Sequence, residues 1–570
     1  MLGTDRVTYG KAVAGLLLMH LAMLGWIAYW NSPVNDEVGH LTAGIYQWRF
    51  GNFHIYRVNP PLVKLVAAIP AAFGNPHVDW SQASDSPSVR TEFELGLDFI
   101  RANRPGAEWY FTAGRLLCLP FTFLGGWMCF LWGRSLYGPR SGFVACVLWC
   151  LSPVVLGWGS TFTPDAAAAS FGLLAAFTFR NWLANGTWKS AFWAGITLGV
   201  CELTKMTWIV LFVVWPLLWL VWRRPGLVER VNFKTDIGQL GLLLILGVYV
   251  INVGYGFEGT GRSLGKYEFV SQALTGNQIT GTPGNRFCDT ILAKCPIPLP
   301  YNYVRGLDLQ KVDFEKGLES YLFRTWSDRG WWYYYPVAAC LKLPLGMLLL
   351  FMIVVVCHVV PRCGLKLTRD EMVLIVPAIV VFVLVCSQTG FGRYIRYILP
   401  SLPAAFVLIS KLWNQPWPRW AARSFLGLLV WSTLSSLWIY PHSMSYFNEL
   451  AGGPLGGHRY LLDANVDWGQ DLIRLKHWIK DHPEARPMYC ICAGFVSPQE
   501  IGIDCQWPPK MSSPESDPQQ NLIPEPGWYA ISVHELFERH GSYRYMQKYR
   551  PVSRVGYSMW IYHIPELQRE

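Results

Sequence analysis

The chain has 570 residues, of which 52% are hydrophobic, 15% aromatic and only 15% charged, and its formal net charge is +10 at pH 7. This composition is too apolar and too poor in charge for a soluble globular protein. The basic residues stand in short clusters between apolar runs, which excludes a nucleic-acid-binding face and favours the positive-inside pattern of membrane proteins. We therefore predict a polytopic α-helical membrane protein.

Apolar segments near the length that a helix needs to cross a bilayer recur along the chain, and they predict about eleven transmembrane helices. The first segment lacks a small-residue cleavage site, so we interpret it as an anchor rather than a signal peptide. The predicted spans are residues 9–30, 113–137, 141–158, 165–184, 189–203, 206–222, 236–256, 331–360, 371–388, 395–412 and 424–441.

Basic residues mark alternate connections between these spans. Arg134 and Arg140 lie in one such loop, and Arg362 and Lys366 lie in another. By the positive-inside rule this side is cytoplasmic, together with the N-terminus. The loops 31–112 and 257–330 and the C-terminus are then predicted to lie outside the cytoplasm.

The apolar signal stops after Pro441, and residues 442–570 predict a small extracytoplasmic domain of mixed α/β type. Leu472 to Asp481 has helical spacing, while Met488 to Phe495 and Trp528 to Val533 have the pattern of strands. The run Trp468-Gly469-Gln470-Asp471 is either a functional acid cluster or, as we favour, a capped helix start.

Five of the fourteen cysteines lie in loops placed outside the cytoplasm, where disulfides form. Cys288 can pair with Cys295, and Cys505 can pair with Cys490 or Cys492. The other cysteines lie mostly in apolar segments, and we interpret them as small buried hydrophobic residues.

Ionisable side chains gather on the outer side, at the ends of predicted spans. Snorkelling to the interface explains any one of them, but carboxylates and cations together on one side indicate a functional site. If residues 36–50 form a helix, Asp36 and His40 share one of its faces. The residues of this group are Asp36, Glu37, Lys64, Arg115, Asp165, Glu202, Lys205, Arg393 and Arg396.

The order of these residues carries a family resemblance over roughly residues 9–441. The chain resembles the integral-membrane glycosyltransferases of the C-type fold. Among these it resembles most the family of protein O-mannosyltransferases and lipid A aminoarabinose transferases. Asn59 stands where protein mannosyltransferases often have His, and the tail beginning Tyr446-Phe447-Asn448 looks like that of bacterial members. The matching motifs are Asp36-Glu37, Pro60-Pro61-Leu62-Val63-Lys64, Arg115, Asp165, Thr204-Lys205, Gly330-Trp331-Trp332 before Lys342-Leu343-Pro344, and Arg393 to Pro400.

The resemblance implies a glycosyltransferase domain over residues 1–441 that moves a sugar from a polyprenyl-phosphate carrier to a hydroxyl acceptor, a protein or a glycolipid, with inversion. It implies a site on the outer face of a bacterial inner membrane. A hydroxyl that attacks an anomeric carbon needs a base, and the departing phosphate needs fixed cations. The catalytic candidates are Asp36 as the base, Glu37 and Asp165. The lipid-phosphate candidates are Lys64, Arg115, Lys205, Arg393 and Arg396, and His40 and Asn59 are further site candidates.

No cofactor is expected, because the chain has neither an Asp-x-Asp pair nor a His/Cys cluster with ligand spacing. A divalent metal at Asp36, Glu37 and His40 is the alternative. A transporter is the alternative function, which predicts internal repeats and charges spread across the membrane depth. A non-catalytic scaffold would make the acidic pair dispensable.

Overall fold

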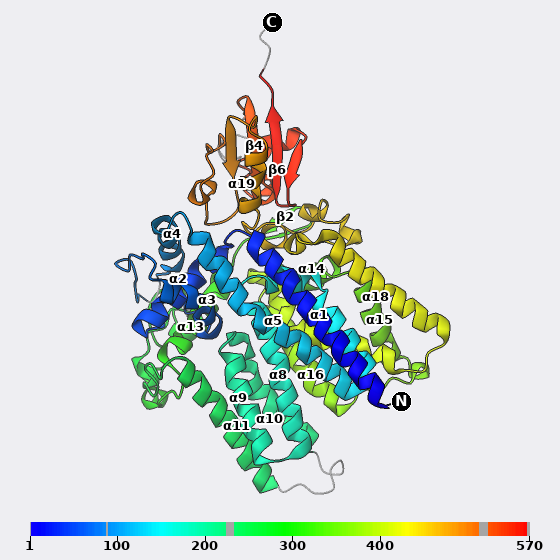
Figure 1. Cartoon of the computed structure of the whole chain (residues 1–570). Helices are drawn as coiled ribbons and strands as arrows, with labels where there is room; N and C mark the ends of the chain where they lie inside the picture. The colour runs from blue at the N-terminus through cyan, green and yellow to red at the C-terminus, as the bar shows by residue number, and fades with distance from the viewer. Residues whose placement is uncertain (1, 87–88, 224–232, 512–521, 567–570) are drawn as a thin grey trace.

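Helices make up most of the chain, and the computed structural model describes residues 2–86, 89–223, 233–511 and 522–566. Figure 1 shows a bundle of long helices with a small sheet-containing unit at one end, from which the C-terminus emerges. The bundle helices are α1 (Leu2–Trp30), α5 (Ala107–Tyr137), α6 (Pro139–Cys150), α7 (Pro153–Gly159), α8 (Pro164–Asn185), α9 (Trp188–Glu202), α10 (Leu211–Trp222), α11 (Phe233–Gly254), α14 (Tyr334–Lys342), α15 (Leu345–Val359), α16 (Arg369–Ser387), α17 (Leu402–Ser410) and α18 (Arg419–Ile439).

Each of the eleven predicted spans contains helix, but several are interrupted. Among the described residues, six helices are long and apolar enough to cross a bilayer, or seven if α6 and α7, bent by 57°, count as one span. Pro153 and Pro344 mark two of the breaks, because the residue before a proline is disfavoured in helical conformation. The helical membrane character is confirmed, and the number eleven stays a prediction.

A second group of helices lies to one side of the bundle, at the left in Figure 1. It consists of α2 (Asn35–Phe50), α3 (Pro61–Gly74), α4 (Glu92–Ala102), α12 (Gln272–Thr275) and α13 (Tyr301–Lys316). The predicted helix over residues 36–50 is therefore confirmed as α2. Gly44 allows α2 and α3 to meet, because a Cβ atom at this position would lie 2.3 Å from the Lys64 carbonyl oxygen.

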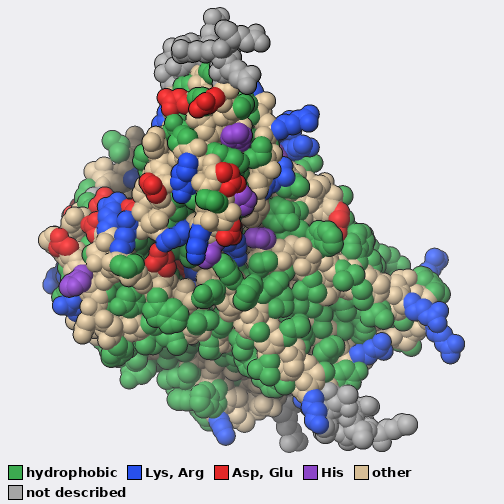
Figure 2. All heavy atoms as spheres, turned by 45° about the horizontal axis from the view of Figure 1, so that its top comes forward, with side chains coloured by type: hydrophobic (Ala, Val, Ile, Leu, Met, Phe, Trp, Pro, Cys, Tyr) green, Lys and Arg blue, Asp and Glu red, His purple; other side chains and the backbone are tan. Residues whose placement is uncertain are grey.

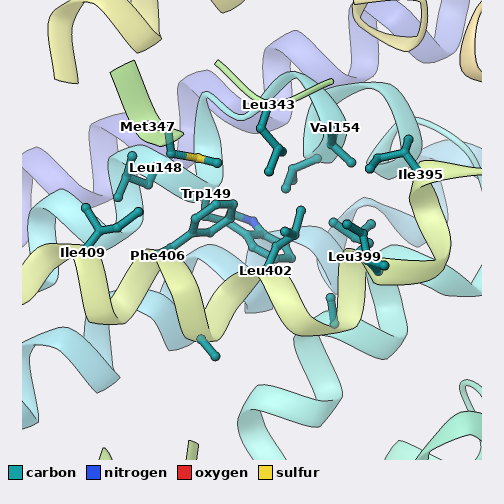
Figure 3. Close-up of a cluster of buried hydrophobic side chains, with 14 of the residues drawn as sticks. Leu148, Trp149, Val154, Leu343, Met347, Ile395, Leu399, Leu402, Phe406 and Ile409 are labelled. Carbon is teal, nitrogen blue, oxygen red and sulfur yellow. The ribbon is translucent and has the colours of Figure 1, made fainter. Parts of the chain in front are cut away.

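Buried side chains from distant parts of the chain form the core beside the predicted site. Figure 3 shows Trp149 of α6 among Leu399, Leu402 and Phe406. The indole N–H of Trp149 donates to the Thr122 carbonyl oxygen at 3.0 Å. Inside a bilayer such close packing, rather than exclusion of water, holds helices together. This packing anchors the 3-10 helix η6 (Ile395–Ser401), which carries Arg396.

The small unit contains a four-stranded sheet of order β3-β4-β6-β5. β3 runs parallel to β4, and the other pairs are antiparallel. The predicted helix and the two predicted strands appear as α19, β3 and β4, although β3 ends at Ile491 instead of at Phe495. Residues 512–521 and 567–570 of the predicted domain lie outside the described residues. The elements are α19 (Leu472–Asp481), α20 (Val533–Phe537), β3 (Met488–Ile491), β4 (Gly527–Ser532), β5 (Ser553–Val555) and β6 (Met559–Ile564), with the hairpin β1 (Ser320–Leu322) and β2 (Thr325–Ser327) outside it.

Two predictions about residues 257–330 and 442–570 need correction. Asp471 precedes α19 without capping it through its side chain; the carboxylate instead accepts from Arg474 at 2.9 Å and from Ser558 at 2.7 Å. All fourteen cysteines are free thiols, so neither predicted disulfide is formed. Cys490 nevertheless shares a hydrogen bond with Cys505, which raises the pKa of the Cys490 thiol.

Charge and hydrophobicity are separated along the molecule. Figure 2 shows charged side chains over the small unit and its surroundings, and mostly hydrophobic side chains on the face of the bundle below it. Exposed hydrophobic residues on this bundle include Ile245, Ile379 and Leu434. Such a continuous apolar surface is unfavourable in water and typical of a surface in contact with lipid.

Candidate active site

A cavity of about 360 Å³ lies where α2, α8, α13, α16 and η6 meet. Segments far apart in the sequence supply its wall, and both charge signs are represented. Its polar lining comprises Asp36, Tyr56, Asn59, Arg90, Asp165, Lys205, Thr207, Gln310, Asp313, Tyr335, Gln388, Tyr394, Arg396 and Tyr397. Its apolar lining includes Met206 and Ile209 of the 3-10 helix η1 (Met206–Val210), Leu307 and Phe314 of α13, and Leu384 and Val385 of α16.

The charged residues of this cavity form a connected chain. Arg396 donates to Asp36 at 2.6 Å, and its Nε atom lies 3.7 Å from Asp165. The ammonium group of Lys205 donates to the other oxygen of Asp165 at 2.6 Å. Four of the residues predicted from the sequence are thus brought together by α2, α8, the start of η1 and η6.

Aromatic rings surround the Arg396 guanidinium group. Its central carbon lies 4.4 Å from the ring centre of Trp468, 4.9 Å from that of Tyr394, 5.2 Å from that of Trp158 and 5.3 Å from that of Tyr397. The Nε and Nη1 atoms of Arg396 are buried without a hydrogen-bond partner. A buried cation with unused donors, held between rings, is suited to bind an anion.

Arg90 also lines the cavity, and the sequence analysis missed it. Its guanidinium group donates to Glu92 at 2.7 Å and lies 3.3 Å from Asp313 of α13. It also packs on the rings of Tyr56 and Phe93. Arg90 belongs to a long polar loop rather than to the end of an apolar span, so no hydropathy signal distinguished it from a solvated residue.

Glu37 and Arg115 form a buried ion pair that does not line the cavity. Arg115 donates to the two Glu37 oxygens at 2.9 and 2.5 Å, and both side chains are fully buried. Arg115 also donates to the carbonyl oxygens of Ala28, Asn31 and Ser32, while Glu37 accepts from two backbone N–H groups. The pair fixes the connection between α1 and α2. Because the N–H groups of Arg115 already donate to these oxygens, few remain for a phosphate.

Lys64 is placed beneath the cavity wall rather than in it. Its ammonium group donates to the carbonyl oxygens of Tyr56 at 2.8 Å and of Asn59 at 2.7 Å. Burial lowers the pKa of Lys64 to about 7. Asn59 itself lines the cavity, so Lys64 supports the turn that presents it.

His40 is buried on α2, and neither ring nitrogen has a hydrogen-bond partner. Its ring stacks on that of Tyr56 with the centres 4.4 Å apart. Burial, reinforced by the charges of Lys64 and Arg396, lowers the pKa of His40 well below its usual value. His40 therefore supports Tyr56 as a neutral ring.

The remaining predicted residues are held outside the cavity lining. Arg393 forms an ion pair with Asp463 of the C-terminal region. Glu202 is buried at the end of α9, where it accepts from the hydroxyl group of Tyr303 at 3.0 Å. Among the described residues, no group of three or more His, Cys, Asp or Glu side chains is arranged to hold a metal ion.

Fold and charge distribution define a multi-pass helical membrane protein. Residues 110–255 match the family model described as dolichyl-phosphate-mannose-protein mannosyltransferase. For this segment, which carries Arg115, Asp165 and Lys205, the match confirms the family resemblance indicated by the sequence. No curated protein matches the chain.

Several solved structures are similar to the chain at low identity. ArnT from Cupriavidus metallidurans bound to undecaprenyl phosphate is 13% identical, with a TM-score of 0.46 and coverage of 98% of each chain. The S. cerevisiae protein O-mannosyltransferase Pmt1-Pmt2 complex bound to the sugar donor is 16% identical, with a TM-score of 0.34 over 45% of this chain and 33% of that chain. The archaeal oligosaccharyltransferase AglB from Archaeoglobus fulgidus is 13% identical, with a TM-score of 0.37 over 74% of this chain and 56% of that chain.

Proposed function

We propose that the chain is an inverting glycosyltransferase that moves a sugar from a polyprenyl-phosphate carrier to a hydroxyl acceptor on the outer face of a bacterial inner membrane. The observation that carries this proposal is the cavity, in which the Asp36 carboxylate meets the Arg396 guanidinium group beside an apolar wall. The family match over residues 110–255 supports the same class of enzyme. The acceptor class, a protein or a glycolipid, follows from the resemblance alone.

The cavity suits a lipid-linked donor because it combines cations with an apolar wall. Arg396 and Lys205 are the phosphate contacts that we favour, since both line the cavity and Arg396 has unused donors. Leu384 and Val385 lie on α16, one of the candidate spans, and the Leu384 side chain is 39% exposed. The apolar wall therefore reaches toward the lipid-facing surface, where the first isoprene units of a carrier would lie.

The transfer needs one base and a stabilised leaving group. The acceptor hydroxyl attacks the anomeric carbon and gives its proton to a carboxylate, and the bond from that carbon to the phosphate oxygen breaks with its electron pair on the phosphate. Asp36 is the better base, because its side chain is 21% exposed whereas that of Asp165 is 2% exposed. Arg396 and Lys205 then stabilise the lipid monophosphate that leaves.

The other charged residues have supporting roles in this proposal. Glu37 and Arg115 hold the start of α2, and therefore Asp36, through their buried pair. Lys64 holds the turn that ends at Asn59. Arg393 binds Asp463, and Arg90 closes the cavity wall between Glu92 and Asp313.

The proposal is tested by sugar transfer with purified full-length protein in lipid. A panel of polyprenyl-phosphate sugars is supplied to wild type and to Asp36→Asn, in the presence of a chelator in place of divalent metal. Carrier-dependent transfer by wild type that is lost in the variant is the expected result. Asp481→Asn, which changes an exposed carboxylate at the end of α19, is the matched control and keeps activity. If the wild-type protein transfers sugar from none of the donors but moves a solute across the bilayer, the result would contradict the enzyme proposal and favour a transporter.

A further inference from the structure

The start of the C-terminal region is attached to the segment that precedes Asp36. The Ser32 hydroxyl donates to the Gly469 carbonyl oxygen at 2.8 Å and accepts from the Leu472 N–H at 2.8 Å. The Ser32 N–H donates to the Gln470 carbonyl oxygen at 3.0 Å. Ser32 is four residues before Asp36, so residues 469–472 help to fix where α2 begins.

The same region is attached to the segment that carries Arg396. Asn465 accepts from the Ile395 N–H at 3.1 Å and donates to the Arg393 carbonyl oxygen at 2.6 Å. The carbonyl oxygen of Asn465 accepts from the buried Lys342 at 2.5 Å. Residues on both sides of the Asp36–Arg396 pair are therefore bound by one short stretch, residues 463–472, which we call the connector.

Trp468 lies in the middle of the connector and contacts Arg396 directly. Its side chain is buried, and its ring centre lies 4.4 Å from the guanidinium carbon. The ring packs edge-on against that of Trp158 with the two ring centres 5.0 Å apart. The backbone N–H of Trp468 donates to the side-chain oxygen of Gln470 at 2.7 Å. Trp468 is thus held from two sides, while the cavity lining does not include it.

We propose that the connector is a positioning device and that Trp468 is a positioning residue, which keeps the Arg396 guanidinium group against Asp36 and Asp165. This inference rests on the proposed transferase function and assigns a role in it to the C-terminal region. An arginine side chain has many rotamers, and a cation that must stabilise a departing phosphate is most useful when its place is fixed in advance. An aromatic face can fix it without competing for its donors.

The test compares three variants of the full-length protein in lipid. Trp468→Leu removes the aromatic face and keeps apolar bulk, Trp468→Phe keeps a ring, and Trp528→Leu changes a tryptophan in β4 that packs on Trp478 and His563. The Michaelis constant for the polyprenyl-phosphate donor and kcat are measured at equal amounts of folded protein. We expect Trp468→Leu to raise the Michaelis constant and lower kcat/KM by about tenfold or more, Trp468→Phe to recover most of this loss, and Trp528→Leu to have wild-type constants.

Each result has a separate meaning. An active wild type with unchanged constants in Trp468→Leu would overturn the positioning role and leave the transferase in place. If Trp468→Leu and Trp468→Phe both lower the yield of folded protein equally and leave the kinetic constants unchanged, Trp468 has a structural role only. This result would also overturn the inference. A wild type that turns over no donor would overturn the transferase and, with it, the role of the connector.

Discussion

Arg396 donates a hydrogen bond of 2.6 Å to Asp36, although the two residues lie 360 positions apart in the sequence. The pair joins the start of α2 to η6. A carboxylate and a cation that already lie together need little reorganisation when charge develops in a reaction. Changes at either residue should therefore affect turnover more than folding.

Replacement of Arg396 by Lys tests the geometry of this cation. An ammonium group keeps the charge but lacks the planar fork with which an arginine can contact two carboxylates and a phosphate at once. We expect Arg396→Lys to lower kcat/KM for the lipid-linked donor by about tenfold to a hundredfold, with the thermal midpoint near that of wild type. Steady-state kinetics with a polyprenyl-phosphate sugar measures the effect, and unchanged kinetics would remove Arg396 from the phosphate site.

Comparison of Asp36→Asn with Asp165→Asn assigns the base. Asp36 has the more exposed side chain, whereas Asp165 is held by Lys205 at 2.6 Å. Loss of a general base costs about a hundredfold to ten-thousandfold in kcat. We expect the Asp36 variant to show that loss and the Asp165 variant to show a smaller one, with a higher Michaelis constant because Lys205 and Arg396 lose a partner. The reverse order would assign the base to Asp165.

Arg115→Ala tests the buried pair with Glu37. The substitution leaves a buried carboxylate and three carbonyl oxygens without their donor. Breaking one partner of a buried pair costs about 3–5 kcal/mol of stability. We expect a clearly lower thermal midpoint and a poor yield of folded protein, measured in detergent beside wild type. A stable variant that has lost only its affinity for the lipid carrier would instead make Arg115 a phosphate contact.

Part of the lining of this cavity was predictable from the sequence because charges at the ends of apolar spans are costly. Asp36, Asp165, Lys205 and Arg396 stood out for this reason, and the structure brings them to one cavity. The helix α2 was equally predictable, since turn-favouring residues precede its start. Its end at Phe50 is set by Gly51, which adopts the left-handed conformation and donates its N–H to the Gln47 carbonyl oxygen.

The partners of these charges were not predictable, because they depend on the tertiary fold. Arg115 and Arg396 have similar positions at span ends. The N–H groups of Arg115 donate to Glu37 and to backbone oxygens, whereas Arg396 keeps donors without a hydrogen-bond partner. Arg90 and Trp468 lie in polar segments where no hydropathy boundary singles them out. Their contacts, of Arg90 with Asp313 and of Trp468 with Arg396, become visible only when α13 and η6 are placed beside them.

The pairing of the cysteines in and beside the four-stranded sheet can be tested by oxidation. Cys490 of β3 and Cys505 share a hydrogen bond, whereas Cys492 donates to the Val496 carbonyl oxygen at 3.2 Å. We therefore expect mild oxidation to join Cys505 to Cys490 rather than to Cys492. Mass spectrometry of unreduced peptides identifies the pair. Cys492→Ser should leave the cross-link intact, and a Cys492–Cys505 peptide would contradict the assignment.

Asp467 should make the stability of the protein depend on pH. Burial raises its pKa from the ordinary 3.8 to about 7, even though it accepts hydrogen bonds from Ser532 and from the Gly469 N–H. Between about pH 4 and pH 7 the folded protein therefore holds a proton that the unfolded chain has released. By linkage, its contribution to stability is full below pH 4 and is lost as the pH rises through 7.

Asp467→Asn imitates the protonated form at every pH and tests this expectation. The amide can accept from Gly469 and donate to Ser532, so the contacts of the neutral acid are kept. We expect the variant to unfold at a temperature on the order of a few degrees above wild type at pH 8, and at a similar temperature at pH 4. Asp481→Asn, at an exposed position at the end of α19, should show no such difference. A gain of equal size at both pH values would mean that Asp467 does not bind this proton.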